Sequence, residues 1–151
     1  MSAILDVVLS YLPQDSGYLS KWLLFVSAVA VFNSVQNFVT LKLTQRVYQE
    51  RPQDVTWLSS RTFGTWTFLS AVVRAYAAYN ITNPQVYDIC MWSYAIAGFH
   101  FVSEWLVFGT ASLGAGLTGP LIVSSSSLAW MFTQREFYAG AASVAAKVAG
   151  A

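Results

Sequence analysis

Four long apolar segments, separated by polar or glycine-rich connections, dominate the hydrophobic pattern of the chain. They cover about residues 22–41, 63–79, 87–108 and 117–132. A membrane core about 30 Å thick takes about 20 helical residues, because each residue adds about 1.5 Å. The second and fourth segments are shorter than that and would need a locally thinner bilayer or aromatic anchors. The pattern predicts an all-α, polytopic membrane protein with four transmembrane helices.

The two ends of the chain differ from these segments. Residues 3–12 place apolar side chains on one helical face and precede Pro13, which predicts a short interfacial helix or a frayed terminus. Residues 139–151 are mostly Ala, Gly, Val and Ser, with too little apolar bulk to pack, which predicts disorder. Residues 1–138 are therefore expected to form a single four-helix transmembrane domain.

The composition supports a membrane protein and narrows its partners. Apolar residues make up 56% and charged residues 10% of the chain, where soluble domains carry about 25% charged residues. The net charge is +1 and the eight Lys and Arg residues are scattered, so nucleic acid is not a predicted partner. The single cysteine, Cys90, excludes an internal disulfide and a cysteine-based metal site. Positive-inside counting separates the two membrane sides by one residue and leaves the orientation open.

The motifs that could indicate an enzyme are weak. Residues 114–119 (GAGLTG) match a dinucleotide-binding fingerprint, but that motif requires a preceding strand, and here an apolar helix precedes it and Pro120 follows. His100 and Glu104 have ligand-like i, i+4 spacing, yet two ligands do not hold a catalytic metal. A hydrogen-bonded pair is favoured there, and a general acid–base role stays open. The sequence predicts no metal, no cofactor and no catalytic residues.

Polar side chains inside the apolar segments form the main candidate site, because each is costly in lipid and normally faces protein or water. In the first segment they recur with helical spacing and share one face. Helix rise places them in the same half of the membrane as polar residues of the second and third segments. The members of this predicted polar network are Asn33, Gln36, Asn37, Arg61, His100 and Glu104. Within it, Arg61 is predicted to pair with Glu104.

A second predicted pair lies deeper along the second and third segments. Arg74 is expected to pair with Asp88, or to extend its side chain to the nearer membrane surface. The polar network itself has two interpretations. It can hold helices together, through interhelical hydrogen bonds that average under about 1 kcal/mol each. Alternatively, it can line a cavity that binds a ligand.

Five sequence blocks carry a family resemblance. They are 21–26 (KWLLFV), 32–37 (FNSVQN), 61–67 (RTFGTWT), 100–105 (HFVSEW) and 119–124 (GPLIVS). Together they resemble the ergosterol-biosynthesis scaffold family of the endoplasmic reticulum, over roughly residues 18–138. All six members of the predicted polar network match polar positions of these blocks. The small-residue tail departs from the family.

The resemblance implies a multi-pass tether in the endoplasmic reticulum membrane, with no catalytic residues to carry over. Its implied partners are the sterol C-4 methyl oxidase, the sterol C-4 decarboxylating dehydrogenase and the sterol 3-keto reductase. Holding enzymes of successive steps together raises the effective concentration of each partner. Free polar faces also leave surface for a homodimer and for membrane lipids.

Two other functions remain as alternatives. The first is a small lipid- or sterol-binding or transport protein, in which the polar network lines an intramembrane cavity. Leu43, Tyr48 and Arg51 satisfy a loose cholesterol-contact pattern that would agree with it. The second is a membrane enzyme that uses His100 and Glu104.

Overall fold

The computed structural model describes residues 7, 10–15 and 17–140. Its helices in chain order are α2 (Leu19–Val39), α3 (Lys42–Val47), α4 (Trp57–Tyr79), α5 (Pro84–Leu106) and α6 (Thr118–Thr133). A short 3-10 turn covers Pro52–Asp54, and a π-helical turn covers Glu136–Gly140. Across these described residues there is no strand, which confirms the all-α prediction.

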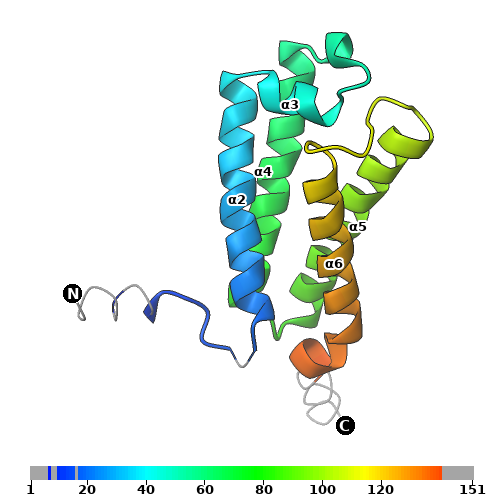
Figure 1. The fold of residues 1–151 in the computed structure, drawn as a ribbon. Coiled ribbons are helices and arrows are strands. Elements are labelled where there is room, and N and C mark those ends of the chain that lie inside the picture. The colour runs from blue at the N-terminus through cyan, green and yellow to red at the C-terminus, as the bar shows by residue number, and fades with distance from the viewer. Residues whose placement is uncertain (1–6, 8–9, 16, 141–151) are drawn as a thin grey trace.

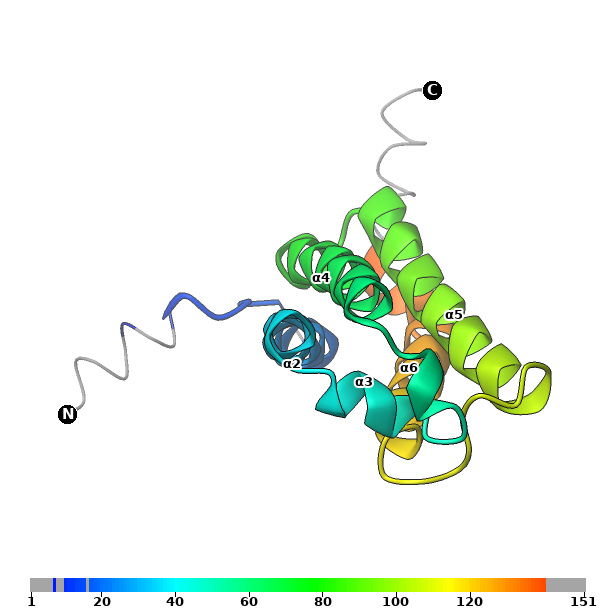
Figure 2. The same ribbon diagram turned by 90° about the horizontal axis from the view of Figure 1, so that it is seen from above.

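The long helices pack as two pairs (Figures 1 and 2). α2 lies along α4 over most of its length, and α6 lies along α5. The two pairs meet through α4 and α5, whereas α2 and α6 face each other across a gap between their ribbons. The short α3 lies across one end of this arrangement. α3 was not predicted from the apolar pattern, because six polar and apolar residues in a loop carry no helical period.

Local capping explains where α4 and α5 begin. Thr56 and Ser59 form a reciprocal capping box, in which each side-chain oxygen accepts from the other residue's backbone N–H. α4 therefore starts at Trp57, six residues before the apolar segment that predicted it. At α5, the side chain of Asn83 accepts from two backbone N–H groups and Pro84 occupies the first turn.

Small residues let α2 and α4 approach closely. A Cβ added to Gly64 would lie 3.0 Å from Cβ of Asn37, so only glycine fits there without a shift. About two turns further along α4, the hydroxyl of Ser27 in α2 donates to the carbonyl of Ala71 at 2.7 Å. Close contact between small residues is the usual way that helices associate in membranes. The best-packed face of α2 is thus fixed against α4.

Only part of the four-span prediction is confirmed. Among the described helices, α2 alone is long and apolar enough to pass as a membrane span. α4 and α5 each have 23 residues but carry more polar groups, and α6 has 16 residues. The crossing of a membrane by all four helices therefore stays a prediction.

The predicted terminal structures meet the described part of the chain only at its edges. Most of the predicted interfacial helix, and residues 141–151 of the predicted disordered tail, lie outside the described residues. Ala139 and Gly140 do not follow the prediction of a disordered tail. Both are buried in the Glu136–Gly140 turn, which packs against α5.

Candidate functional site

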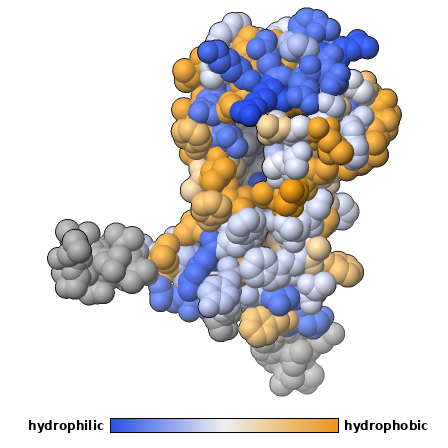
Figure 3. All heavy atoms as spheres, viewed as in Figure 1, coloured by the Kyte–Doolittle hydropathy of each residue, from blue (hydrophilic) through white to orange (hydrophobic). Residues whose placement is uncertain are grey.

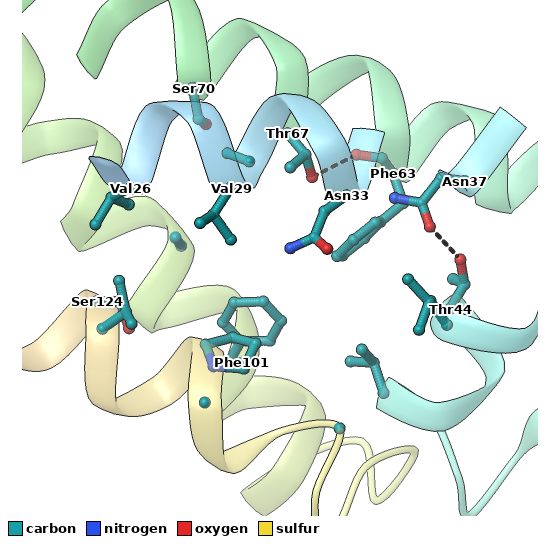
Figure 4. A pocket seen from close by; sticks show the side chains of 18 of the residues that line it. Val26, Val29, Asn33, Asn37, Thr44, Phe63, Thr67, Ser70, Phe101 and Ser124 are labelled. Atoms are coloured by element: carbon teal, nitrogen blue, oxygen red, sulfur yellow. Dashed lines mark hydrogen bonds between the residues drawn. The ribbon is translucent and has the colours of Figure 1, made fainter. Parts of the chain in front are cut away.

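Asn37, near the end of α2, joins three helices through buried hydrogen bonds. The hydroxyl of Thr44 in α3 donates to Asn37 Oδ1 at 2.7 Å, and the hydroxyl of Ser60 in α4 donates to the Asn37 carbonyl at 2.9 Å. The two hydroxyl oxygens lie 2.9 Å apart, and all three residues are buried. Figure 4 shows Asn37 and Thr44 facing each other across the end of the cavity described below. This cluster fixes α3 to the α2–α4 pair.

Replacing Thr44 by valine is expected to destabilise the protein by about 1–3 kcal/mol, because it leaves Asn37 Oδ1 buried without its donor. Valine has nearly the same shape, so the change removes a hydroxyl and little else. Thermal unfolding of the detergent-purified protein measures the effect. Thr62→Val is the matched control, since the exposed Thr62 hydroxyl donates only to Leu58 O within its own helix. Equal midpoints for the two variants would contradict the role given to Thr44.

A second polar cluster connects the loop after α3 to α5. The Tyr48 hydroxyl lies 2.7 Å from His100 Nε2, and His100 Nδ1 lies 4.0 Å from Glu104 Oε1. With the imidazole proton on Nδ1 facing Glu104, Nε2 accepts from the Tyr48 hydroxyl. The other Glu104 oxygen accepts a short hydrogen bond from the Thr110 hydroxyl. Burial, with the Glu104 charge adding to it, raises the pKa of Tyr48, so the phenol stays neutral and holds the loop on α5.

The predicted pairing of Arg61 with Glu104 is not formed. Arg61 is exposed, and within the described ranges it takes part neither in the Arg135–Asp88 ion pair nor in the His100–Glu104 contact. The reason is its direction around α4: Ser60 points into the bundle, and the next residue is turned by about 100°. Glu104 is held instead by His100 and Thr110.

The predicted pairing of Arg74 with Asp88 is not formed either. Asp88 makes a two-pronged ion pair with Arg135, at 2.7 and 2.8 Å, because α6 runs back toward the start of α5. These hydrogen bonds raise the pKa of Arg135. Both side chains are partly exposed, so solvent screens the pair and it contributes little to stability. Arg74 lies elsewhere: it is only 7% exposed and stacks over the ring of Tyr94 at 4.0 Å.

The other network members also separate. Asn33 faces the cavity described next, whereas Gln36 is half-buried and its Oε1 has no hydrogen-bond partner within the described residues. The predicted network is therefore two clusters, one around Asn37 and one around His100. Sequence analysis missed Thr44, Ser60, Tyr48 and Thr110 as their partners. All four lie at helix ends or in connections, where hydroxyls are common and carry no specific signal.

A cavity of about 390 Å³ lies between the two helix pairs, beneath α3. Figure 4 shows its wall, with Val26 and Ser124 at one end and Asn37 and Thr44 at the other. Residues that line it include Val26, Val29, Asn33, Phe63, Trp66, Thr67, Phe101, Val123 and Ser124. Arg74 and Tyr94 also line it, and so does Arg46 of α3. An apolar cavity with a few converging polar groups is the usual form of a small-molecule site.

A second cavity, of about 530 Å³, is lined by the Tyr48–His100 cluster and adjoins the first. The two share Thr44, Phe63 and Trp66 in their walls. The ring of His100 lies among aromatic rings, with its centroid 5.6 Å from that of Trp66. The shared side chains of Thr44, Phe63 and Trp66 therefore lie between two hollows at the same end of the bundle.

The glycine-rich segment before α6 packs against α3 and shows no sign of a dinucleotide site. Gly116 lies directly on the backbone of Arg46 and Val47, where no side chain fits. Nothing resembling the strand that the fingerprint requires precedes it within the described residues. The glycines serve close packing of this loop on α3.

Comparisons with known proteins cover nearly all of the described bundle. The sequence model of a family described as "Erg28 like protein" matches residues 19–129. Ergosterol biosynthetic protein 28 of Saccharomyces cerevisiae is 54% identical over 127 residues, which cover 83% of this chain and 86% of the yeast protein. The protein of the same name from Candida albicans is 54% identical over 124 residues, or 82% and 90% of the two chains. A human homologue is 40% identical over 114 residues, or 75% and 81%. No solved structure matches.

Proposed function

Because the chain belongs to the Erg28 family, we propose that it is a non-catalytic membrane scaffold of sterol synthesis. The observation that carries the proposal is the family match, which runs from the first residue of α2 into α6. The family is not known to be catalytic. The curated relatives are named for ergosterol biosynthesis, which supports the same pathway for this chain.

The proposed partners are the enzymes of sterol C-4 demethylation: the methyl oxidase, the decarboxylating dehydrogenase and the 3-keto reductase. The chain would hold them side by side in the endoplasmic reticulum membrane. Their sterol intermediates dissolve in lipid, so an assembly in the plane of the membrane limits loss to the bulk bilayer. Proximity raises the effective concentration of each partner without any new contact at an active site.

The proposed membrane arrangement has α2, α4, α5 and α6 crossing the bilayer, with α3 and the adjoining loops at one surface. The supporting feature is the number of large apolar side chains that point outward, which a soluble protein of this size would bury. Examples on the four helices are Phe32 (62% exposed), Leu69 (64%), Phe99 (74%) and Phe132 (74%). Figure 3 shows polar residues gathered around the α3 end and apolar residues below them.

The two polar clusters support a structural rather than a catalytic use of the polar residues. The Asn37 cluster joins α2, α3 and α4, and the His100 cluster joins α5 to the loop after α3. Each connects elements that are distant in sequence. In a scaffold, such links keep the outward faces of the helices in a fixed relation, which docking of several partners requires.

Quantitative pulldown tests the proposal. A tagged methyl oxidase should recover the dehydrogenase from detergent extracts when this chain is present, and several-fold less when it is deleted. An unrelated four-span protein of the same membrane, expressed at the same level, is the control for membrane load. Equal recovery with and without the chain would overturn the scaffold function.

A second candidate function, lipid or sterol binding, is favoured by one observation, the 390 Å³ cavity between the helix pairs. It predicts that the chain binds a lipid when purified alone. A scaffold and a lipid site are compatible, since the proposed partners pass sterol intermediates to one another.

A further inference from the structure

We propose that the cavity between the helix pairs binds a lipid carboxylate, whose acidic group pairs with the buried guanidinium of Arg74. The inference deepens the proposed function and rests on it for one point, the sterol skeleton of the ligand. The preference for a lipid that carries a carboxylate follows from the shape of the cavity and from its charges.

Arg74 is a buried cation, and no acidic side chain among the described residues pairs with it. It is 7% exposed, and the acidic groups that lie near a basic side chain in the described part of the chain, Asp88 and Glu104, face Arg135 and His100 instead. Its hydrogen bonds are long and go to neutral oxygens of Ser93, at 3.3 Å to the hydroxyl and 3.5 Å to the carbonyl. A guanidinium stays protonated and has five N–H donors, so most of its donor capacity is unused. Leaving such a charge uncompensated inside a bundle is costly, and an anion is the natural partner.

The cavity supplies the space for that anion. Arg74 and Arg46 line it, and among the residues that the structure describes no Asp or Glu does. Its field is therefore positive, while most of the wall is apolar. The volume of about 390 Å³ falls within the range of about 300–1,000 Å³ found for small-molecule sites. A ligand with one negative group and a compact apolar body matches both features.

The position of Arg74 sets the direction of the ligand. Arg74, Tyr94 and Val26 lie at the end of the cavity away from α3, since Ser27 of α2 is bonded to Ala71 of α4 at that level. From there to Asn37 the helix rise gives about 16 Å. The acidic group would lie at the Arg74 end, with the apolar body extending toward Phe63 and Phe101 (Figure 4).

We place the entrance for this ligand between α2 and α6. At one end these helices are joined by a hydrogen bond from Trp22 Nε1 to the Ser127 hydroxyl, at 2.9 Å. At the other end, α3 and the loop at Gly116 close the space. Between these two closures the ribbons of α2 and α6 lie apart in both views (Figures 1 and 2). Figure 3, seen from the same side, shows this face hollowed below the polar end.

The geometry favours a carboxylate on a rigid or single-chain lipid over a phospholipid. Arg74 lies about 7 Å inside the end of α4, deeper than a phosphate head group that stays at the membrane surface. A planar guanidinium binds a carboxylate through two parallel hydrogen bonds. Within the proposed function the source is a sterol acid, because oxidation of a methyl group must supply the carboxyl group that a decarboxylating enzyme removes.

Direct binding to the full chain in nanodiscs tests the inference. The probes are a sterol carboxylic acid, the sterol alcohol that differs only by CH₂OH at the same carbon, oleic acid, and phosphatidylglycerol, an anionic phospholipid without a carboxylate. Binding is followed by tryptophan fluorescence, since Trp66 lines the cavity. The acid is expected to bind about tenfold or more tightly than the alcohol, the effect of one charge-assisted hydrogen-bonded pair.

Arg74→Gln should abolish that preference, whereas Arg74→Lys should restore part of it. Arg46→Gln is the matched control, because it removes the other cavity arginine, which is exposed. If Arg74→Gln does not fold, thermal unfolding of the unaltered protein is measured instead. The acid should raise its unfolding midpoint, and the alcohol should not. Equal binding of acid and alcohol, or tighter binding of phosphatidylglycerol than of the acid, would overturn the inference.

Oleic acid separates the two sources of a lipid carboxylate. Tighter binding of the sterol acid than of oleic acid supports the sterol assignment, and the reverse order rejects it while keeping the carboxylate at Arg74. Since no partner enzyme is present in this assay, its failure is distinct from failure of the scaffold. A chain that recovers both enzymes in pulldown but binds no acid would reject the cavity inference alone.

Discussion

Replacing Gly116 by alanine is expected to displace α3 from the bundle. The loss of stability should be among the largest that adding a single methyl group to this chain can cause. The added Cβ would overlap the carbonyl group of Arg46 and lie 2.9 Å from the backbone nitrogen of Val47. Backbone atoms cannot rotate away as a side chain does, so either the loop or α3 must move. Overpacking typically costs about 1–3 kcal/mol, and this contact belongs at the upper end of that range. The unfolding midpoint should fall by roughly 6–12 °C.

Gly119→Ala is the control for this prediction. It adds the same methyl group three residues away, where nothing lies within 4 Å, so it should leave the midpoint unchanged or slightly raised. Thermal unfolding of both variants in the same detergent, followed by tryptophan fluorescence, gives the comparison. Similar midpoints for the two variants would show that the loop does not rest on α3.

Cells that lack the chain are expected to accumulate C-4-methylated sterols, and His100→Ala is expected to correct the defect nearly as well as the unaltered chain. In a scaffold, His100 holds the loop of Tyr48 on α5, so its loss weakens one link. If His100 were instead a general acid or base, its removal would lower the reaction rate by about 10²–10⁴-fold. Sterol profiles by mass spectrometry, normalised to the amount of each variant in the membrane, measure the difference.

The control for this experiment is Arg61→Ala, which alters an exposed residue of the same predicted network. Both variants should keep the sterol profile within about twofold of normal, since neither removes the helix faces that dock partners. A His100→Ala chain that is present at normal abundance, yet leaves the sterol profile of a deletion, would favour the enzyme alternative.

Sequence reasoning was most successful for the helices. Apolar length located α2, α4, α5 and α6, and the signals at Thr56–Ser59 and Asn83–Pro84 could have placed the first residues of α4 and α5 more closely. It failed for α3, because docking by Thr44 and by the Gly116 loop involves contacts distant in sequence. Such contacts have no local pattern.

The candidate site shows why depth in the membrane was insufficient to predict pairs. Helix rise correctly placed Asn37, His100 and Glu104 toward one end of the bundle. It gave no direction around the helix axis, so Arg61 was paired with Glu104 although it points outward. Similarly, Arg74 was matched with Asp88 by depth, whereas Arg135 reaches Asp88 once α6 folds back. The cavity was not predicted, because it depends on how α2 and α6 are placed relative to each other. The sequence of one segment does not determine that placement.

The central claim, that the chain joins two enzymes physically, is tested most directly by titration in reconstituted membranes. Fluorescently labelled oxidase and dehydrogenase are placed in liposomes, and energy transfer between them is measured as the amount of this chain increases. A tether with one site for each enzyme predicts a rise, a maximum, and then a fall, because excess chain binds the two enzymes separately. Energy transfer that stays at its starting value at every ratio would contradict the account.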